Sequence, residues 1–282
     1  MRKIFLICCF MLAAGCTSAP QYQSPAPLTT KENSESYKLF KHDGVNTASH
    51  VQVHLDEAKD IAYVQSFGGD GVALGVAFGP LGVLANISMI QAETNSDLTQ
   101  LYNKIPIPVS AMFTEAASAK SIHYDDNAEG RFHPFMMVVR DENETLRMGT
   151  ALIVELPQAD GKVWSGRYTH QTALHVPLKN VADGLDESEY KTIYDAIQQS
   201  FNELTDIYQQ DRLGQLTDHE QILVNSTFLT PRITIELNGV LLKQDENRVL
   251  VRSGLGIISL PQDDSLELEK VRVKASKKRA KS

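Results

Sequence analysis

The sequence has few cysteines and places all of them at its start. Cys8, Cys9 and Cys16 are the three cysteines among 282 residues, so residues 17–282 contain no thiol. A disulfide, a thiolate metal site and a cysteine nucleophile are therefore excluded from this part of the chain. Its stability has to come from an ordinary apolar core, and the apolar fraction of 42% is that of a globular protein.

The sequence also lacks the short motifs that carry common chemistries. It contains no Gly-x-Ser-x-Gly elbow, no phosphate loop, no His-Glu-x-x-His zinc motif and no calcium loop. Gly254 and Gly256 lack the third glycine and the following helix of a dinucleotide site. We therefore predict no cofactor, no bound metal and no catalytic activity.

Three groups of residues have side chains that can bind a metal. The first is His123, Asp125, Asp126 and His133, the second is His50 and His54, and the third is His170 and His175. We expect the first group to lie in a solvated polar loop. We expect the second to lie on a strand over 50–55. Two histidines spaced by four could bind a metal on a helix, but on this strand both rings should simply face water. His170 and His175 lie on one predicted strand with unlike parity, so we expect them to face opposite sides.

Basic residues are scarce in most of the chain. The net charge is −8, from 27 basic and 35 acidic residues. Residues 1–3 hold two of the basic residues and residues 270–282 hold seven, with no acid in either segment, so residues 4–269 carry a net charge of −17. An acidic body of this kind excludes a nucleic-acid partner, whose phosphates need a basic surface.

Residues 1–16 have the three parts of a secretion signal. Arg2 and Lys3 are basic, residues 4–12 are apolar, and a cleavage site of small residues ends in cysteine: Ala13, Ala14, Gly15 and Cys16. This segment resembles the signal peptide of a bacterial lipoprotein, with Ala13 where leucine is commonest and Leu12 one place early. The resemblance implies cleavage before Cys16 and attachment of lipid to Cys16.

The resemblance also implies a location. Aspartate after the cysteine is the signal for retention in the inner membrane, and Thr17 stands there. We therefore expect an outer-membrane lipoprotein (palmitate-type acylation) that faces the periplasm, with outer-membrane lipid as its partner through Cys16. An uncleaved anchor or an ordinary signal peptide is the alternative, although an apolar run of this length is short for a bilayer, which needs about 20 residues.

The composition divides the chain into four parts. We expect a signal peptide over 1–15 and a flexible tether over 16–36, because this stretch is rich in Ser, Thr, Pro, Gln and Asn. A periplasmic α+β domain follows over 37–273, with a possible sub-boundary near 125–131. Residues 274–282 form a basic tail.

Within the domain we predict antiparallel sheet covered by one long amphipathic helix. Strands are expected over 135–139, 146–156, 163–178, 248–252, 256–260 and 266–273. On the third of these strands, one parity is apolar and should face the core: Trp164, Tyr168, Leu174, Val176 and Leu178. Asn238-Gly239 predicts a hairpin turn between 233–237 and 240–242.

The long helix is predicted over 187–213, with a capping box formed by Asp186 and Glu189. Its polar face should lie in water, with Gln198, Glu203, Asp206 and Gln209. Shorter helices are expected over 95–104 and 109–120, and a short helix or loop over 216–224.

Residues 67–90 are apolar and rich in glycine. Gly71, Gly75 and Gly79 are spaced by four and would line one face of a helix, which would let another backbone approach closely. The segment is either a Gly-rich helix or loop packed on the domain's own sheet, or a hairpin that contacts a membrane or a partner. Pro80 and the cost of glycine in helices favour the first interpretation.

Three functions remain open from the sequence. The favoured one is a lipid-anchored periplasmic accessory protein that binds or scaffolds an unknown envelope protein or polymer without catalysis. The second is a membrane-inserting or oligomeric envelope component that uses residues 67–90. The third is a hydrolase or metal-dependent enzyme whose site has no recognisable motif.

Overall fold

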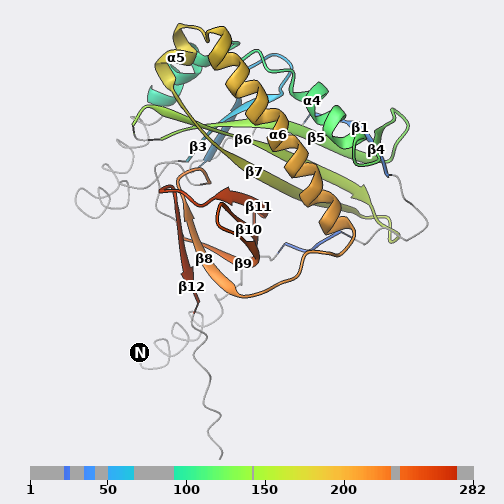
Figure 1. The fold of residues 1–282 in the computed structure, drawn as a ribbon. Helices are drawn as coiled ribbons and strands as arrows, with labels where there is room; N and C mark the ends of the chain where they lie inside the picture. Colours follow the sequence, from blue (N-terminus) through green and yellow to red (C-terminus); the bar gives the residue numbers. More distant parts are fainter. Residues whose placement is uncertain are drawn as a thin grey trace, which may run out of the picture.

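The computed structural model describes residues 22–25, 35–41, 50–66, 92–141, 143–229 and 236–271. It combines helices with one large, mostly antiparallel sheet, which confirms the predicted class (Figure 1). The strands are β1 (Glu35–Leu39), β2 (His50–His54), β3 (Ile61–Ser66), β4 (Ile122–Tyr124), β5 (Gly130–Arg140), β6 (Thr145–Pro157), β7 (Val163–Pro177), β8 (Gln221–Ser226), β9 (Leu237–Gln244), β10 (Arg248–Ser253), β11 (Gly256–Pro261) and β12 (Leu266–Lys270). Among the described residues, the helical segments are 92–101, α4 (Val109–Ser118), α5 (Leu178–Asp183) and α6 (Glu187–Arg212).

The centre of the sheet is the antiparallel meander β5-β6-β7. On its far side β5 pairs in parallel with β1 near its start and with β3 near its end. Because β1 also pairs with β4, strands from both sides of residues 125–131 belong to the same sheet. β7 continues into β11 through three parallel pairs, and the strands β10, β9, β8 and β12 follow in antiparallel order.

The two faces of the central strands are covered by different elements. On one face α4 and α6 pack over β5, β6 and β7, around apolar residues such as Phe113, Phe132 and Phe201. On the other face residues of β3, β5 and β6 share a second apolar cluster with β8–β11. The C-terminal strands therefore close the face of the sheet that the helices leave open.

Helix α6 runs diagonally over β6 and β7 (Figure 1). Its predicted capping box is present, since the Asp186 carboxylate accepts the Glu189 backbone N–H and the Glu189 side chain accepts the Asp186 N–H. An apolar stripe with helical spacing turns to the sheet: Ile193, Ile197, Phe201, Leu204 and Tyr208. The predicted parity of β7 is confirmed by the burial of Trp164 and Tyr168 in this layer.

The predicted turn at Asn238-Gly239 is wrong. Both residues lie inside β9, where Asn238 pairs with Leu223 and Gly239 with Ile222. A Cβ at Gly239 would come within 2.5 Å of Val251 Cγ1 in the neighbouring strand. Glycine is therefore required here by close packing within the sheet and not by a positive φ angle.

Two local predictions also change. Part of the stretch 216–224 is strand β8 and not helix or loop, because it completes the C-terminal sheet between β9 and β12. The side of β2 predicted to face water instead faces the second core: Gln52 and His54 lie opposite Val64 and Ala62, which belong to that core. Accordingly Gln52 and the ring nitrogens of His54 are buried.

Candidate functional site

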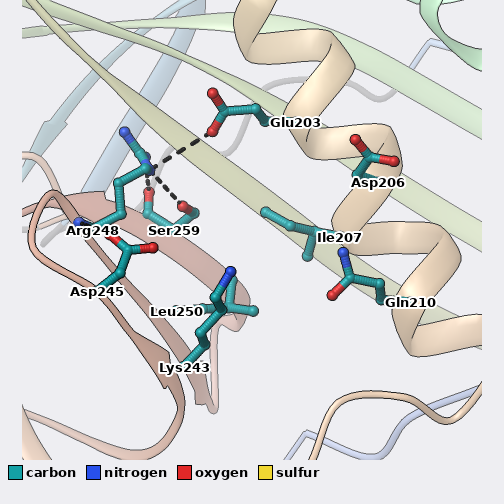
Figure 2. A pocket seen from close by; sticks show the side chains of 9 residues that line it. All are labelled: Glu203, Asp206, Ile207, Gln210, Lys243, Asp245, Arg248, Leu250 and Ser259. Atoms are coloured by element: carbon teal, nitrogen blue, oxygen red, sulfur yellow. Dashed lines mark hydrogen bonds and ion pairs between the residues drawn. The ribbon is translucent and has the colours of Figure 1, made fainter.

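A pocket of about 220 Å³ lies between α6 and the strands β9, β10 and β11. Figure 2 shows that the helix contributes one wall and the strands contribute the other. The lining residues are Glu203, Asp206, Ile207, Gln210, Lys243, Asp245, Arg248, Leu250 and Ser259. The pocket thus combines acidic and basic groups with two apolar side chains, Ile207 and Leu250.

Two of its acidic groups are already held by neighbours. Asp206 forms an ion pair of 2.5 Å with Lys120. The Asp245 carboxylate accepts the backbone N–H groups of Asn247 and Arg248 at 3.0 and 2.9 Å, and these bonds lower the pKa of Asp245. Asp245 therefore fixes the β9–β10 turn, as carboxylates commonly do in tight turns.

Arg248 is the most strongly positioned cation of the pocket. Its Nε donates to Ser259 Oγ at 2.9 Å, and its Nη2 donates to the backbone oxygens of Gln171 and Ser259 at 2.7 and 3.1 Å. Its Nε also lies 3.8 Å from the carboxylate of Glu203 (Figure 2). Burial lowers the pKa of Arg248, but the group remains a cation at neutral pH.

Behind Glu203, a line of polar side chains leads into the protein. Glu203 Oε2 lies 2.7 Å from His170 Nε2, and His170 Nδ1 lies 2.7 Å from Ser200 Oγ. Ser200 Oγ lies 2.8 Å from Thr150 Oγ1 on β6. Because the carboxylate can only accept, Nε2 carries the proton of the neutral ring and Nδ1 accepts from Ser200.

The electrostatics agree with this assignment. Burial lowers the pKa of His170 and keeps the ring neutral at pH 7. The hydrogen bond from His170 lowers the pKa of Glu203 to about 2, so the carboxylate is charged. The pocket therefore presents one carboxylate whose orientation is set from behind by His170.

Ser200, His170 and Glu203 have the group types of a hydrolase triad, but their order in space is reversed. Ser200, on the sheet-facing side of α6, is fully buried and His170 is nearly so, whereas the carboxylate of Glu203 lines the pocket. A nucleophile must reach its substrate, and this hydroxyl does not reach the pocket. The line is suited to joining α6 to β6 and β7.

Replacing Ser200 by alanine should lower the free energy of unfolding by about 1–3 kcal/mol, because buried groups of His170 and Thr150 lose their shared partner. Chemical denaturation measures the change. Ser188→Ala, at an exposed serine of the same helix, is the matched control and should stay within about 0.5 kcal/mol of wild type. Equal losses in the two variants would contradict the joining role of Ser200.

The structure does not assemble the first group of metal candidates. The Asp125 carboxylate accepts a hydrogen bond from the Asn127 backbone N–H at 2.8 Å, and the Asp126 carboxylate accepts one from the Tyr124 hydroxyl. His133 is not in a loop but on β5, fully buried, with its Nε2 3.3 Å from the Lys59 carbonyl oxygen. Across the described residues, no three His, Cys, Asp or Glu side chains are grouped so that they could hold a metal.

The other predicted site residues lie outside the described residues. These are Cys16, Gly71, Gly75 and Gly79. Among the helices that are described, none is both long and apolar enough to cross a bilayer. Comparison of the chain with protein-family models, curated proteins and solved structures gives no match.

The pocket was not predictable from the pattern of α6 alone, on which Glu203 and Asp206 fall on the polar face expected to lie in water. Both are instead partly buried: Glu203 lies beside His170 of β7, and Asp206 lies beside Lys120 in the turn after α4. One signal was available: Ser200 lies in the apolar stripe of α6, seven residues after Ile193 and three after Ile197. A hydroxyl in such a stripe has to find a hydrogen-bond partner in the opposite layer.

Proposed function

We propose that the chain is a lipid-anchored accessory protein of the bacterial outer membrane, whose periplasmic body binds or scaffolds an envelope partner without catalysis. One observation supports the lipid anchor. The single thiol that would remain after cleavage is Cys16, at the end of a short apolar segment that begins with two basic residues. Stable attachment then comes from acyl chains, more than one of which is needed.

The non-catalytic role is supported by the geometry around Glu203. The polar line that most resembles a catalytic one keeps its hydroxyl fully buried, away from the lining of the pocket. The pocket beside it offers Lys243, Arg248 and Glu203 as charged groups at the protein surface. Such a mixture of charged and apolar side chains suits recognition of a polar partner.

Cys16→Ser tests the anchor. The wild-type protein should fractionate with membranes, and the variant should appear in the soluble fraction, because the acyl chains have lost their attachment atom. Mass spectrometry of the wild-type N-terminus should show an acylated Cys16. An unmodified N-terminus at another residue would end the lipoprotein interpretation.

We also propose two finer features of the fold. Helix α6 is the one long amphipathic helix that covers the sheet. Gly71, Gly75 and Gly79 form a face for close backbone packing. Gly75→Leu should then force the packed backbones apart and cost about 1–3 kcal/mol.

Thermal melting and crosslinking in intact cells separate the possible partners of that face. A lowered midpoint would place the partner within the domain. An unchanged midpoint with loss of a crosslink to another protein would indicate an external partner. No change in either measurement would contradict a close-packing role.

A further inference from the structure

Four residues of the expected tether lie in a slot on the body. We call residues 22–25 the strap, and Trp164, Tyr168, Asp211 and Arg252 the slot. The indole Nε1 of Trp164 donates to the Gln23 backbone oxygen at 2.9 Å. The Tyr22 ring meets the rings of Trp164 and Tyr168 edge-on, at 6.1 and 6.3 Å between centroids. Composition alone gave no indication of these contacts.

Asp211 is the centre of the slot. Its side chain is 1% exposed, and it accepts the hydroxyls of Tyr168, Tyr22 and Ser24 at 2.7, 3.0 and 2.7 Å. Burial raises the pKa of both tyrosines, so their hydroxyls remain donors. Two of the three donors come from the strap.

Arg252 connects the slot to the strap from the other side. Its Nη2 lies 3.6 Å from Asp211 Oδ1 and donates to Ser24 Oγ at 3.2 Å. Without the strap, the Asp211 carboxylate would lose two of its three hydroxyl donors and keep Tyr168, with Arg252 nearby. The slot therefore has its full set of hydrogen bonds only when the strap is docked.

Docking shortens the link to Cys16. Tyr22 is six positions after Cys16, and a fully extended chain over six positions reaches about 20 Å. If the strap were free, the next attached element would be β1 at Glu35, and the link could reach about 65 Å. The docked strap therefore keeps the slot close to residue 16.

Three exposed apolar side chains lie close in sequence to residues of the slot. Val163 precedes Trp164, Leu213 follows Asp211 by two residues, and Leu255 follows Arg252 by three. All three are exposed. Figure 1 draws the strap in blue beside the C-terminal end of α6, where Leu213 begins the next loop.

We propose that the docked strap holds this end of the body against the lipid surface that carries Cys16, with Val163, Leu213 and Leu255 turned toward that surface. The inference rests on the proposed acylation of Cys16. The short link determines the distance, and the exposed apolar side chains, which gain by leaving water, determine the orientation. The N-terminal half of α6 then points away from the membrane, toward the periplasm.

The sole tryptophan of the chain, Trp164, reports whether the strap is docked. We compare wild type with the double variant Tyr22→Ala, Ser24→Ala, using the mature protein in detergent. The variant should show red-shifted emission and stronger acrylamide quenching. Gln23→Ala is the matched control, since Gln23 contributes its backbone oxygen and has an exposed side chain, and it should match wild type. Identical spectra for the double variant and wild type would overturn docking.

The orientation is measured in vesicles of phosphatidylethanolamine and phosphatidylglycerol that contain a lipid with a quenching headgroup. A fluorophore is attached to a cysteine introduced at exposed Gln215 or Thr192, near the two ends of α6. The sites are separated by about 30 Å along the helix, so quenching at 215 should exceed that at 192 by about twofold or more. The strap variant should remove most of this difference.

The two proposals fail differently. Protein that does not float with the vesicles would overturn the acylated anchor, and the orientation with it, while the tryptophan spectra would still report docking. Protein that floats but is quenched equally at both positions would overturn the orientation alone. A difference that persists in the strap variant would show that the strap does not set the orientation and would also overturn the inference.

Discussion

Asp97→Ala should lower the free energy of unfolding by about 3 kcal/mol, near the lower end for loss of one partner from a buried ion pair. Asp97 is 2% exposed and accepts from Arg140 Nη1 and from the Tyr63 hydroxyl, each at 2.6 Å. Burial alone would lower the pKa of Arg140, but the hydrogen bond and charge of Asp97 outweigh it and raise that pKa. The variant leaves the guanidinium without its buried partner.

Arg140 supplies its own matched control. Its Nη2 also lies 3.2 Å from Glu144, whose side chain is 76% exposed. Exposed pairs contribute little, so Glu144→Ala should change stability by no more than about 0.5 kcal/mol. Urea denaturation of both variants gives the comparison, and similar losses would show that burial does not determine the strength of this pair.

The same pair explains how residues 92–101 are attached to the sheet. Asp97 is on this helix, whereas Tyr63 and Arg140 lie on β3 and β5. The helix was predictable from its local sequence, although it ends about three residues earlier than expected and already includes residues 92–94. Its partners were not predictable, because nothing local in the sequence links Asp97 to Arg140, 43 residues away.

Elements with strong local patterns were predicted well. The meander β5-β6-β7 was visible from alternating apolar residues and polar turns, and α6 from its cap and its apolar stripe. The hairpin turn predicted at Asn238-Gly239 was wrong because the same dipeptide can either form a turn or place a glycine where a strand is closely packed. Only the neighbouring Val251 decides between these roles, and its position depends on the whole C-terminal sheet.

The pocket and the slot were not predictable from local sequence, because each is formed by residues that lie far apart in the chain. His170 and Ser200 are 30 residues apart, and Tyr22 and Asp211 are 189 residues apart. The composition of residues 16–36 is typical of a flexible segment. Composition does not reveal that hydroxyl groups of this segment donate hydrogen bonds to a buried carboxylate elsewhere in the chain. The lipid site, in contrast, is a local pattern, and Cys16 remains a prediction from sequence.

His133 should make stability depend on pH between about 6.5 and 4. The residue is buried on β5, and burial lowers its pKa from 6.5 to about 4, an effect that outweighs the hydrogen bond with the Lys59 carbonyl. Lys41 and His54 lower the pKa further, and Asp60 raises it. As the pH falls below 6.5, the unfolded chain binds a proton that the folded chain does not, so stability is lost.

At pH 5 the unfolded histidine is mostly protonated and the folded one is not, which corresponds to a loss of about 2 kcal/mol relative to pH 7. His133→Gln keeps an amide that can donate to the Lys59 carbonyl but removes the titrating group. Its loss between pH 7 and pH 5 should be smaller than that of wild type by this amount, whatever its stability at pH 7. Urea denaturation of both proteins at both pH values provides the double difference. His170, whose pKa burial also lowers, should account for part of the dependence that remains. The same dependence in both proteins would mean that His133 is protonated in the folded chain at pH 5, and the burial argument for this residue would fail.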